Sequence, residues 1–370
     1  MQATERVISA DDHIDLTYLP ADLWQSRLPA KYREAGPRVT DGPQGKMWAR
    51  EGRRWGYWGS KRPGNMIIVY DKAGLAEEPE PGVWRAVTPK YRLEDMDNEG
   101  VYAQVLYNFL DWSFEDQDLK SACATAFNSW LAEEICAAAP NRLIGLAVLP
   151  GHDAAAAVAE LKRAKSIGLR GGFFDAFGSV LPIFDPAWEP LWKAAEETGM
   201  PISVHTGAGS HSLGKIPSSA SWKFPALAAT LGMQLEEVLV TIILSGILER
   251  HPGLKFVLGE SGIGWIAFVL ERLDYELMQY DGVAGGVPLK VPPREIFRRQ
   301  VYATFSDERL GVRLIPEIGI DNCLWAADYP HGDGSFPHSK KVIQRMFGDA
   351  DPVLRRKVLH DNAATLYGIV

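Results

Sequence analysis

The chain has 370 residues, of which 46% are hydrophobic and 23% are charged, so it has enough apolar mass for a large core. Its net charge of −8 and pI near 5.6 argue against nucleic acid and anionic membranes as partners. The N-terminus lacks the apolar segment of a signal peptide, and no uninterrupted apolar run is long enough to span a bilayer. Three cysteines without paired spacing indicate a reducing compartment, so we expect a cytoplasmic protein.

Short apolar runs bounded by turn residues predict eight strands. In chain order they cover residues 6–13, 103–108, 143–149, 169–174, 201–205, 255–260, 301–305 and 323–328. Helical patterns lie between most of them, the clearest at residues 154–167, 185–198, 233–249 and 264–280. Alternating strands and helices favour a parallel sheet, and eight strands are the number that a closed barrel needs. We therefore predict an α/β fold, a (β/α)₈ TIM barrel formed by one domain over residues 1–370.

One segment interrupts this alternation. Roughly ninety residues separate the first predicted strand from the second, far more than a crossover helix requires. We predict an insertion over residues 20–95, which contains Trp48, Trp55, Trp58 and Trp84. Loops that follow strands lie at the catalytic face of a barrel, so the insertion is expected to be a lid or substrate wall. An aromatic-rich subunit contact is the alternative, and the two are compatible.

Polar side chains follow several predicted strands directly. Asp11 and His13 end the first strand and point the same way, because side chains of a strand alternate with period two. His205, Glu260 and Asp328 end the fifth, sixth and eighth strands. The ends of distant strands converge at one mouth of a barrel, and buried carboxylates are rare unless they are paired or bind a metal. Each residue alone is weak evidence, since a lone histidine is more often structural, but their joint placement indicates a cation site.

These residues lie in motifs that resemble a known family. The motifs are ISADDHIDL, FDPAWEPLWKAAEETGMPISVHTG, SGILERHPGLKFVLGESGIGW, LWAADYPHGD and HDNAATLYG, which together span nearly the whole chain. They resemble the amidohydrolase superfamily, in its amidohydrolase-related (type 2) branch, which includes decarboxylases for aminocarboxymuconate semialdehyde and for dihydroxybenzoates. The resemblance implies one divalent metal ion, Zn, Mn or Fe, held by Asp11, His13, His205 and Asp328.

The chain departs from the family pattern in two places. Members that decarboxylate or hydrolyse usually carry a histidine at the end of strand six, where this chain has Glu260, and His331 adds an imidazole after Asp328. Glu260 and His331, with Asp12, are candidate ligands of a second metal ion. The alternative for His331 is a group that orients Asp328. Carboxylate-rich sites without thiolate suit iron and manganese.

Three functions remain open at this point. The first is metal-assisted hydrolysis or non-oxidative decarboxylation of a small organic acid or amide, with Glu260 or His331 as the catalytic proton carrier. The second is an oxygenase with a dinuclear iron or manganese centre, in which Glu260 and His331 are ligands. The third, least favoured because the ligand set is complete, is a catalytically silent partner subunit. We expect a small-molecule substrate and a homo-oligomer or a complex with a related paralogue.

Overall fold

The fold was analysed in a computed structural model that describes residues 6–43, 45–59, 78–110, 112–207, 221–280 and 289–370. Eight strands form one sheet in the order β1-β5-β6-β7-β8-β9-β10-β11, and neighbouring strands run parallel. Their bounds are β1 Val7–Asp15, β5 Val101–Phe109, β6 Leu143–Val148, β7 Gly171–Phe173, β8 Ile202–His205, β9 Phe256–Gly259, β10 Val301–Phe305 and β11 Cys323–Trp325. All eight predicted strands are confirmed, with ends that differ by up to three residues.

The sheet closes into a barrel where β1 meets the segment after β11. The backbone N–H of Asp328 donates to the carbonyl of Asp11 at 3.1 Å, and that of His13 donates to the carbonyl of Tyr329 at 2.6 Å. The hydroxyl of Ser9 accepts from the N–H of Ala327 at 2.7 Å. These bonds join the first and last strands at their carboxyl ends, so residues separated by more than three hundred positions share one mouth.

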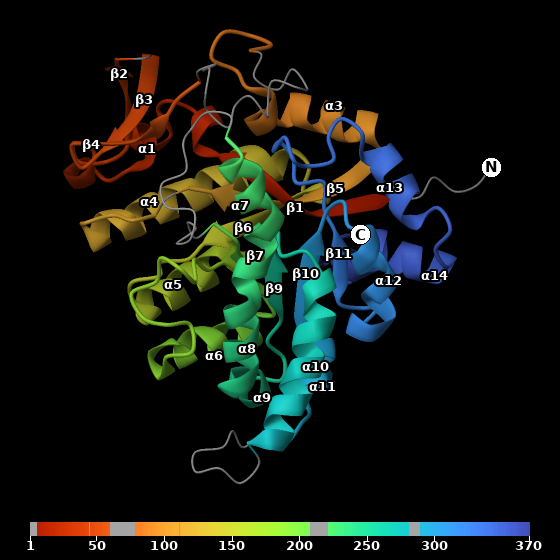
Figure 1. Cartoon of the computed structure of the whole chain (residues 1–370). Helices are drawn as coiled ribbons and strands as arrows, with labels where there is room; N and C mark the ends of the chain where they lie inside the picture. Colours follow the sequence, from red (N-terminus) through yellow and green to blue (C-terminus); the bar gives the residue numbers. More distant parts are fainter. Residues whose placement is uncertain (1–5, 44, 60–77, 111, 208–220, 281–288) are drawn as a thin grey trace.

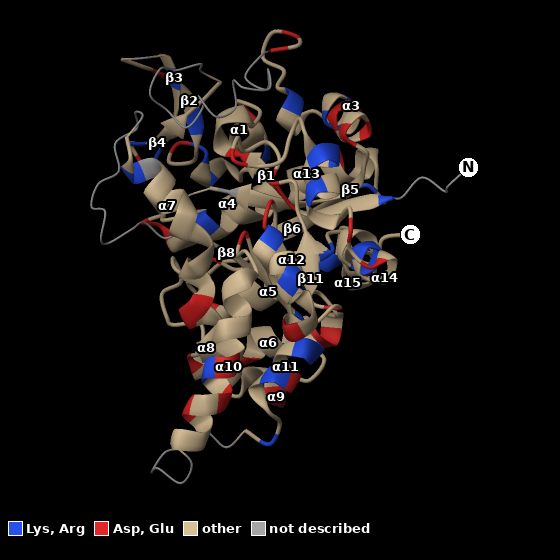
Figure 2. Ribbon diagram, turned by 45° about the vertical axis from the view of Figure 1, so that its right-hand side comes forward, with Lys and Arg blue, Asp and Glu red and all other residues tan. Residues whose placement is uncertain are grey.

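Helices surround the sheet (Figure 1). Those in the barrel are α4 Gln117–Trp130, α5 Ala154–Ser166, α6 Glu189–Thr198, α7 Lys223–Leu231, α8 Glu236–Leu244, α9 Ile247–Arg250, α10 Gly264–Gln279, α11 Pro293–Gln300, α12 Arg309–Ile318, α13 Ser339–Phe347, α14 Pro352–Arg356 and α15 Asn362–Tyr367. The helix predicted over residues 233–249 is divided, because Gly246 adopts a left-handed φ of 76° between α8 and α9. Acidic and basic residues are interspersed along the ribbon rather than separated into regions of one charge (Figure 2).

The insertion after β1 has its own small sheet. Strands β2 (Arg38–Gly42), β3 (Gly45–Arg50) and β4 (Arg53–Tyr57) are antiparallel, and α1 (Leu23–Arg27) precedes this sheet in sequence while α3 (Pro89–Glu99) follows it. Trp48 and Trp84 are buried, while Trp55 and Trp58 are half-buried against the core. The tryptophans therefore serve mainly as core of the insertion. Residues 60–77 of the predicted lid lie outside the described residues, and the lid stays a prediction.

Two groups of buried residues stabilise the barrel. The larger group lies between the sheet and the helices. The smaller group contains alternate residues of the strands, such as Ile8 and Ala103, together with Tyr367 and Ile369 from the C-terminal end of the chain. Arg170 fixes this end, since its guanidinium donates to the carbonyl of Gly368 at 2.8 Å. The last residues thus pack with the side chains that point toward the barrel axis.

One helical stretch within the described ranges, Pro225–Leu244, has the length and composition of a membrane span, with a mean hydropathy of 1.6 and 28% of it buried. It comprises α7, a 3₁₀ turn and α8, which belong to the ring of helices around the barrel. Length and apolar composition alone do not separate such a stretch from a helix of a globular protein. The three cysteines, Cys123, Cys136 and Cys323, are buried free thiols, and burial raises the pKa of each.

Candidate metal centre

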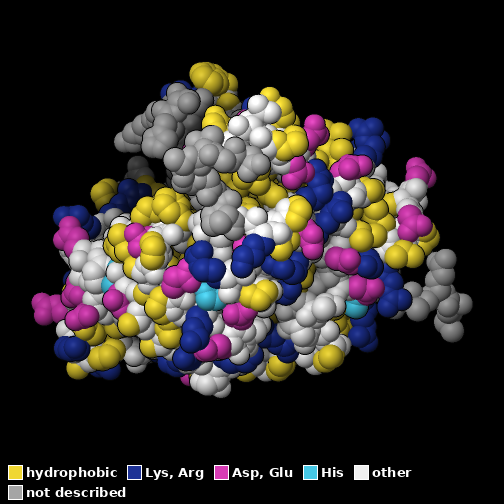
Figure 3. Space-filling model, turned by 90° about the horizontal axis from the view of Figure 1, so that it is seen from below, with side chains coloured by type: hydrophobic (Ala, Val, Ile, Leu, Met, Phe, Trp, Pro, Cys, Tyr) yellow, Lys and Arg dark blue, Asp and Glu magenta, His cyan; other side chains and the backbone are white. Residues whose placement is uncertain are grey.

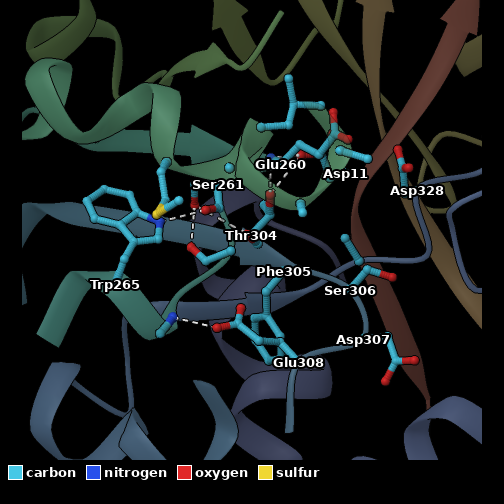
Figure 4. Close-up of a pocket in the computed structure, with 18 of the residues that line it drawn as sticks. Asp11, Glu260, Ser261, Trp265, Thr304, Phe305, Ser306, Asp307, Glu308 and Asp328 are labelled. Atoms are coloured by element: carbon cyan, nitrogen blue, oxygen red, sulfur yellow. Dashed lines mark hydrogen bonds between the residues drawn. The ribbon is translucent and has the colours of Figure 1, made fainter. Parts of the chain in front are cut away.

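Six polar side chains meet at the carboxyl end of the barrel. Asp11 and His13 extend from β1, His205 ends β8, Glu260 follows β9, and Asp328 and His331 follow β11. Five of the six side chains are buried, and Glu260 is partly exposed. Figure 4 shows Asp11 and Glu260 close together at one end of a cavity, with Asp328 beside them. The structure therefore brings together six of the seven predicted site residues.

Asp12 is the residue that does not join them. Along β1 the side chains of Asp11 and His13 enter the cluster, while Asp12 lies on the other side of the strand. Its Oδ1 accepts a hydrogen bond from the backbone N–H of Tyr329 at 2.9 Å. Burial raises the pKa of Asp12 well above its usual value, although the charge of Arg92 opposes this rise. Asp12 thus belongs to a buried network behind the site.

The potential ligand atoms lie within coordination reach of one another. His13 Nε2 is 2.9 Å from Asp328 Oδ1 and 3.7 Å from Asp11 Oδ1. His205 Nε2 is 3.6 Å from Asp11 Oδ1 and 3.4 Å from Glu260 Oε2. Two groups of ligand atoms, each spanning at most 4.8 Å, share His13: one adds Asp11 and His205, and the other adds Glu260, Asp328 and His331.

The surroundings of these atoms test whether a cation fits. Asp11 Oδ2 accepts from the backbone N–H of Glu260 and from the hydroxyl of Thr304, both at 2.7 Å, which leaves Oδ1 directed toward the imidazoles. Glu260 and Asp328 have positive φ values of 49° and 57°, an uncommon conformation for residues other than glycine. Strain of this kind is concentrated at functional sites. Carboxylate oxygens and imidazole nitrogens in this arrangement can hold Mn²⁺, Fe²⁺ or Zn²⁺.

His331 lies against both His13 and Asp328. Its ring stacks on that of His13 with centroids 4.0 Å apart, and its Nδ1 is 3.0 Å from Asp328 Oδ1. Its Nε2 is 3.5 Å from Oδ1 of Asp15, a buried residue that the sequence analysis did not single out. The sequence could have indicated Asp15, because side chains alternate along β1 and Asp15 therefore points to the same side as Asp11 and His13.

The charges of the cluster perturb its proton equilibria strongly. Burial opposes the charged form of His205, but the carboxylates of Asp11 and Glu260 outweigh it and raise the pKa of His205 to about 9. Burial and the nearby Asp328 raise the pKa of Glu260 to about 8. Burial alone would raise the pKa of Asp328, but His331 and His13 hold it below its usual value. In the metal-free protein, protons are therefore bound at side chains that would otherwise bind a divalent cation.

The cluster opens into a cavity of about 500 Å³. One wall is α7 and the turn after it, another is the start of α10, and the third is the segment after β10. Away from the cluster the lining is mixed. Its apolar part includes Leu231, Met233, Trp265, Phe305 and Leu310, and its polar part includes Ser261, Ser306, Asp307 and Glu308 (Figure 4). Among the described residues, none from the insertion over residues 20–95 lines this cavity.

Arg92 supports the site from behind. It is fully buried on α3 and donates to the carbonyl of His13 at 2.9 Å and to Oε1 of Gln104 at 2.7 Å. Its guanidinium also lies over the ring of Tyr329, 4.8 Å from the centroid. Arg92 and Thr304 were both missed by the sequence analysis, because neither residue type is a metal ligand and only the folded contacts reveal their position.

The fold and the cluster together define a (β/α)₈ barrel with a potential metal site at its carboxyl end. Residues 55–369 match the family model described as amidohydrolase. The chain therefore belongs to the amidohydrolase family, as the sequence motifs predicted, and it is an enzyme of that family.

Three similar proteins illustrate the range of the match. Gamma-resorcylate decarboxylase of Rhodococcus jostii is 28% identical over 256 residues, covering 65% of this chain and 74% of the relative. The structure of 5-carboxyvanillate decarboxylase from Sphingomonas paucimobilis superposes with a TM-score of 0.71 at 25% identity, covering 99% of this chain and 100% of that one. A dihydroxybenzoic acid decarboxylase from Polaromonas, with bound manganese, gives a TM-score of 0.67 at 18% identity over 98% and 97% of the two chains. None of these three proteins is an oxygenase by name.

Proposed function

We propose that this enzyme is a metal-dependent, non-oxidative decarboxylase of a small aromatic carboxylic acid. The observation that carries the proposal is the buried group of carboxylates and imidazoles at the end of a cavity whose walls include the apolar side chains of Leu231, Met233, Trp265 and Phe305. The similarity to named decarboxylases supports the choice of decarboxylation over amide hydrolysis. A cavity of about 500 Å³ has room for a single substituted aromatic ring.

Asp11, His13, His205 and Asp328 would hold one divalent ion. The ion would supply positive charge to bind and polarise an oxygen of the substrate. Thr304 and the N–H of Glu260 fix the carboxylate of Asp11, while His331 orients Asp328 through its Nδ1. The carboxylates of Asp11 and Asp328 would therefore be oriented for coordination before the ion binds.

Decarboxylation breaks the bond between the ring carbon and the carboxyl carbon. The electron pair stays on the ring carbon, carbon dioxide leaves, and a proton must reach the ring carbon in its place. Glu260 is suited to deliver that proton, since its side chain is partly exposed and lines the cavity beside the metal cluster. The apolar part of the wall, with Trp265 and Phe305, would pack against the flat face of the ring.

The experiment is a decarboxylation assay on the full chain loaded with Mn²⁺. We expect carbon dioxide release from at least one acid in a panel that includes 2,6-dihydroxybenzoate and 5-carboxyvanillate. Glu260→Gln should retain the metal and lose roughly 10²-fold or more in kcat. A metal-loaded protein that releases no carbon dioxide from any acid of the panel would refute the proposal, and a fully active Glu260→Gln would refute the role of Glu260 alone.

The number of metal ions is a separate question. Beyond the four proposed ligands, Glu260 and His331 lie in one group with His13 and Asp328, so they offer more ligands than one ion requires. A second ion, as in the oxygenase alternative, would bind to these additional ligand atoms. Metal analysis decides between the two: one ion per chain agrees with the decarboxylase site described above, and two spectroscopically coupled irons would favour the oxygenase.

A further inference from the structure

Asp15 is a buried carboxylate that lies behind the metal cluster. It is the last residue of β1, and the alternation of side chains along the strand places it on the same side as Asp11 and His13. The residue is only 5% exposed, and its Oδ1 is 3.5 Å from Nε2 of His331. Asp15 belongs to neither group of potential ligand atoms found among the described residues. It therefore reaches the cluster through His331 rather than as a ligand.

His331 is held between two carboxylates. Its Nδ1 forms a hydrogen bond of 3.0 Å with Oδ1 of Asp328, and its Nε2, at the other edge of the ring, faces Oδ1 of Asp15. One face of the ring is covered by the ring of His13. An imidazole binds a metal ion through the lone pair of a ring nitrogen. Because each ring nitrogen of His331 faces a carboxylate oxygen, neither is directed at an open coordination position.

Asp328 depends on support from its neighbours. Its backbone has a positive φ of 57°, which is uncommon for a residue other than glycine. Its Oδ1 contacts Nε2 of His13 at 2.9 Å and Nδ1 of His331 at 3.0 Å. In the proposed centre His13 is itself a ligand, so its nitrogen would be used by the ion. His331 then remains as the side chain that holds the carboxylate of Asp328, and Asp15 is the group that holds His331.

We propose that Asp15 is a positioning residue that fixes Asp328 for metal binding through His331, and that this arrangement keeps His331 out of the coordination sphere. The inference rests on the proposed metal centre and adds to it a group outside the ligand set. It implies that the centre binds one divalent ion, because among the described residues of the two ligand groups Glu260 is then the only ligand left for a second ion. Removal of a group that orients a metal site in this way typically weakens metal binding by about 10- to 100-fold.

The test is a calorimetric titration of the metal-free full chain with Mn²⁺, without substrate. Asp15→Ala and His331→Ala should each raise the dissociation constant of Mn²⁺ roughly tenfold or more. The double variant should lie within about threefold of His331→Ala, because Asp15 acts through His331 and has no separate effect once the imidazole is gone. Asp15→Asn keeps an oxygen toward Nε2 of His331 and should lose less affinity than Asp15→Ala.

Counting the bound ions tests the second part of the proposal. The underside of the molecule carries acidic side chains among basic and hydrophobic ones (Figure 3), so loosely bound Mn²⁺ is removed by gel filtration before elemental analysis. We expect one Mn²⁺ per chain in the wild-type protein.

Glu160→Ala on α5 is the matched control for loss of a buried carboxylate. Glu160 is also 5% exposed, but it binds Asn128 and Arg163 on the helices outside the barrel. This variant should lose stability without losing affinity for Mn²⁺. Circular dichroism and thermal unfolding show whether each variant is folded.

Three results would overturn the proposal. Asp15→Ala could bind Mn²⁺ as tightly as wild type, or the losses of Asp15→Ala and His331→Ala could add in the double variant, which would mean that Asp15 does not act through His331. The wild-type protein could also hold two ions and His331→Ala only one, which would make His331 a ligand. None of these measurements uses a substrate, so a failure to release carbon dioxide would refute the decarboxylase alone, whereas a wild-type protein that binds no Mn²⁺ would overturn both.

Discussion

Replacement of Thr304 by valine tests whether a single hydroxyl fixes the metal site. The Thr304 hydroxyl donates to Asp11 Oδ2 and accepts from the N–H of Glu260, both at 2.7 Å, so it joins β1, β9 and β10 at the barrel mouth. Thr304→Val keeps the shape of the side chain and removes both bonds. A hydrogen bond to a charged group contributes about 1.5–3 kcal/mol, so we expect a roughly 10- to 100-fold weaker affinity for Mn²⁺.

Calorimetric titration of the metal-free protein with Mn²⁺ measures this loss. Thr304→Ser keeps the hydroxyl and should restore most of the affinity. Thr241→Val is the control, because the Thr241 hydroxyl donates within α8, to the carbonyls of Glu237 and Val238, and not to a residue of the metal cluster. If Thr304→Val binds Mn²⁺ as tightly as wild type, the positioning of Asp11 does not depend on this hydroxyl. If Thr304→Ser is as weak as Thr304→Val, the defect has another cause.

Four further predictions concern the same region. The pKa of His205 in the folded protein, about 9, lies above the ~6.5 of an unfolded histidine, so the stability it gives the metal-free protein is present below about pH 6.5 and is lost as the pH rises to about 9. The raised pKa of Glu260, about 8, acts in the same direction, so thermal unfolding of the metal-free protein should show lower stability at high pH. Mn²⁺ binding at pH 7 should release protons from the cluster to the buffer. A binding enthalpy that does not depend on the buffer would contradict this release. Arg92→Met leaves the buried carbonyls of His13 and Ala86 and the side chain of Gln104 without their donor and should lower the free energy of unfolding in urea by about 3–5 kcal/mol. Gly259→Ala should weaken Mn²⁺ binding measured by calorimetry, because a Cβ there would lie 2.7 Å from the His205 ring; unchanged binding would mean that the ring can move without loss.

The barrel was predictable because each strand has a strong local signal. Apolar runs such as residues 143–149 and 301–305 end at turn residues, and their number and spacing limit the topology. The division of the helix predicted over residues 233–249 was missed. The sequence alone does not indicate that Gly246, a lone glycine inside an apolar stretch, adopts a left-handed conformation.

The candidate site was predictable to the extent that its members are ligand types at strand ends. Asp11, His13 and His205 satisfy that rule, and period-two alternation separates Asp12 from them once the direction of β1 is known. Thr304 could not be found in this way, because its contribution depends on packing between strands that are far apart in sequence. The ligand assignments themselves remain predictions until a metal is bound and located.

The position of the C-terminal residues has a consequence for synthesis on the ribosome. Tyr367 and Ile369 pack inside the barrel with Ile8 and Tyr107, and the Tyr107 ring is 5.3 Å from that of His205. The prospective ligands Asp11 and His13 are synthesised more than three hundred residues before Tyr367 and Ile369, which complete the layer beneath them. Ion capture should therefore follow the synthesis and packing of residues 367–369.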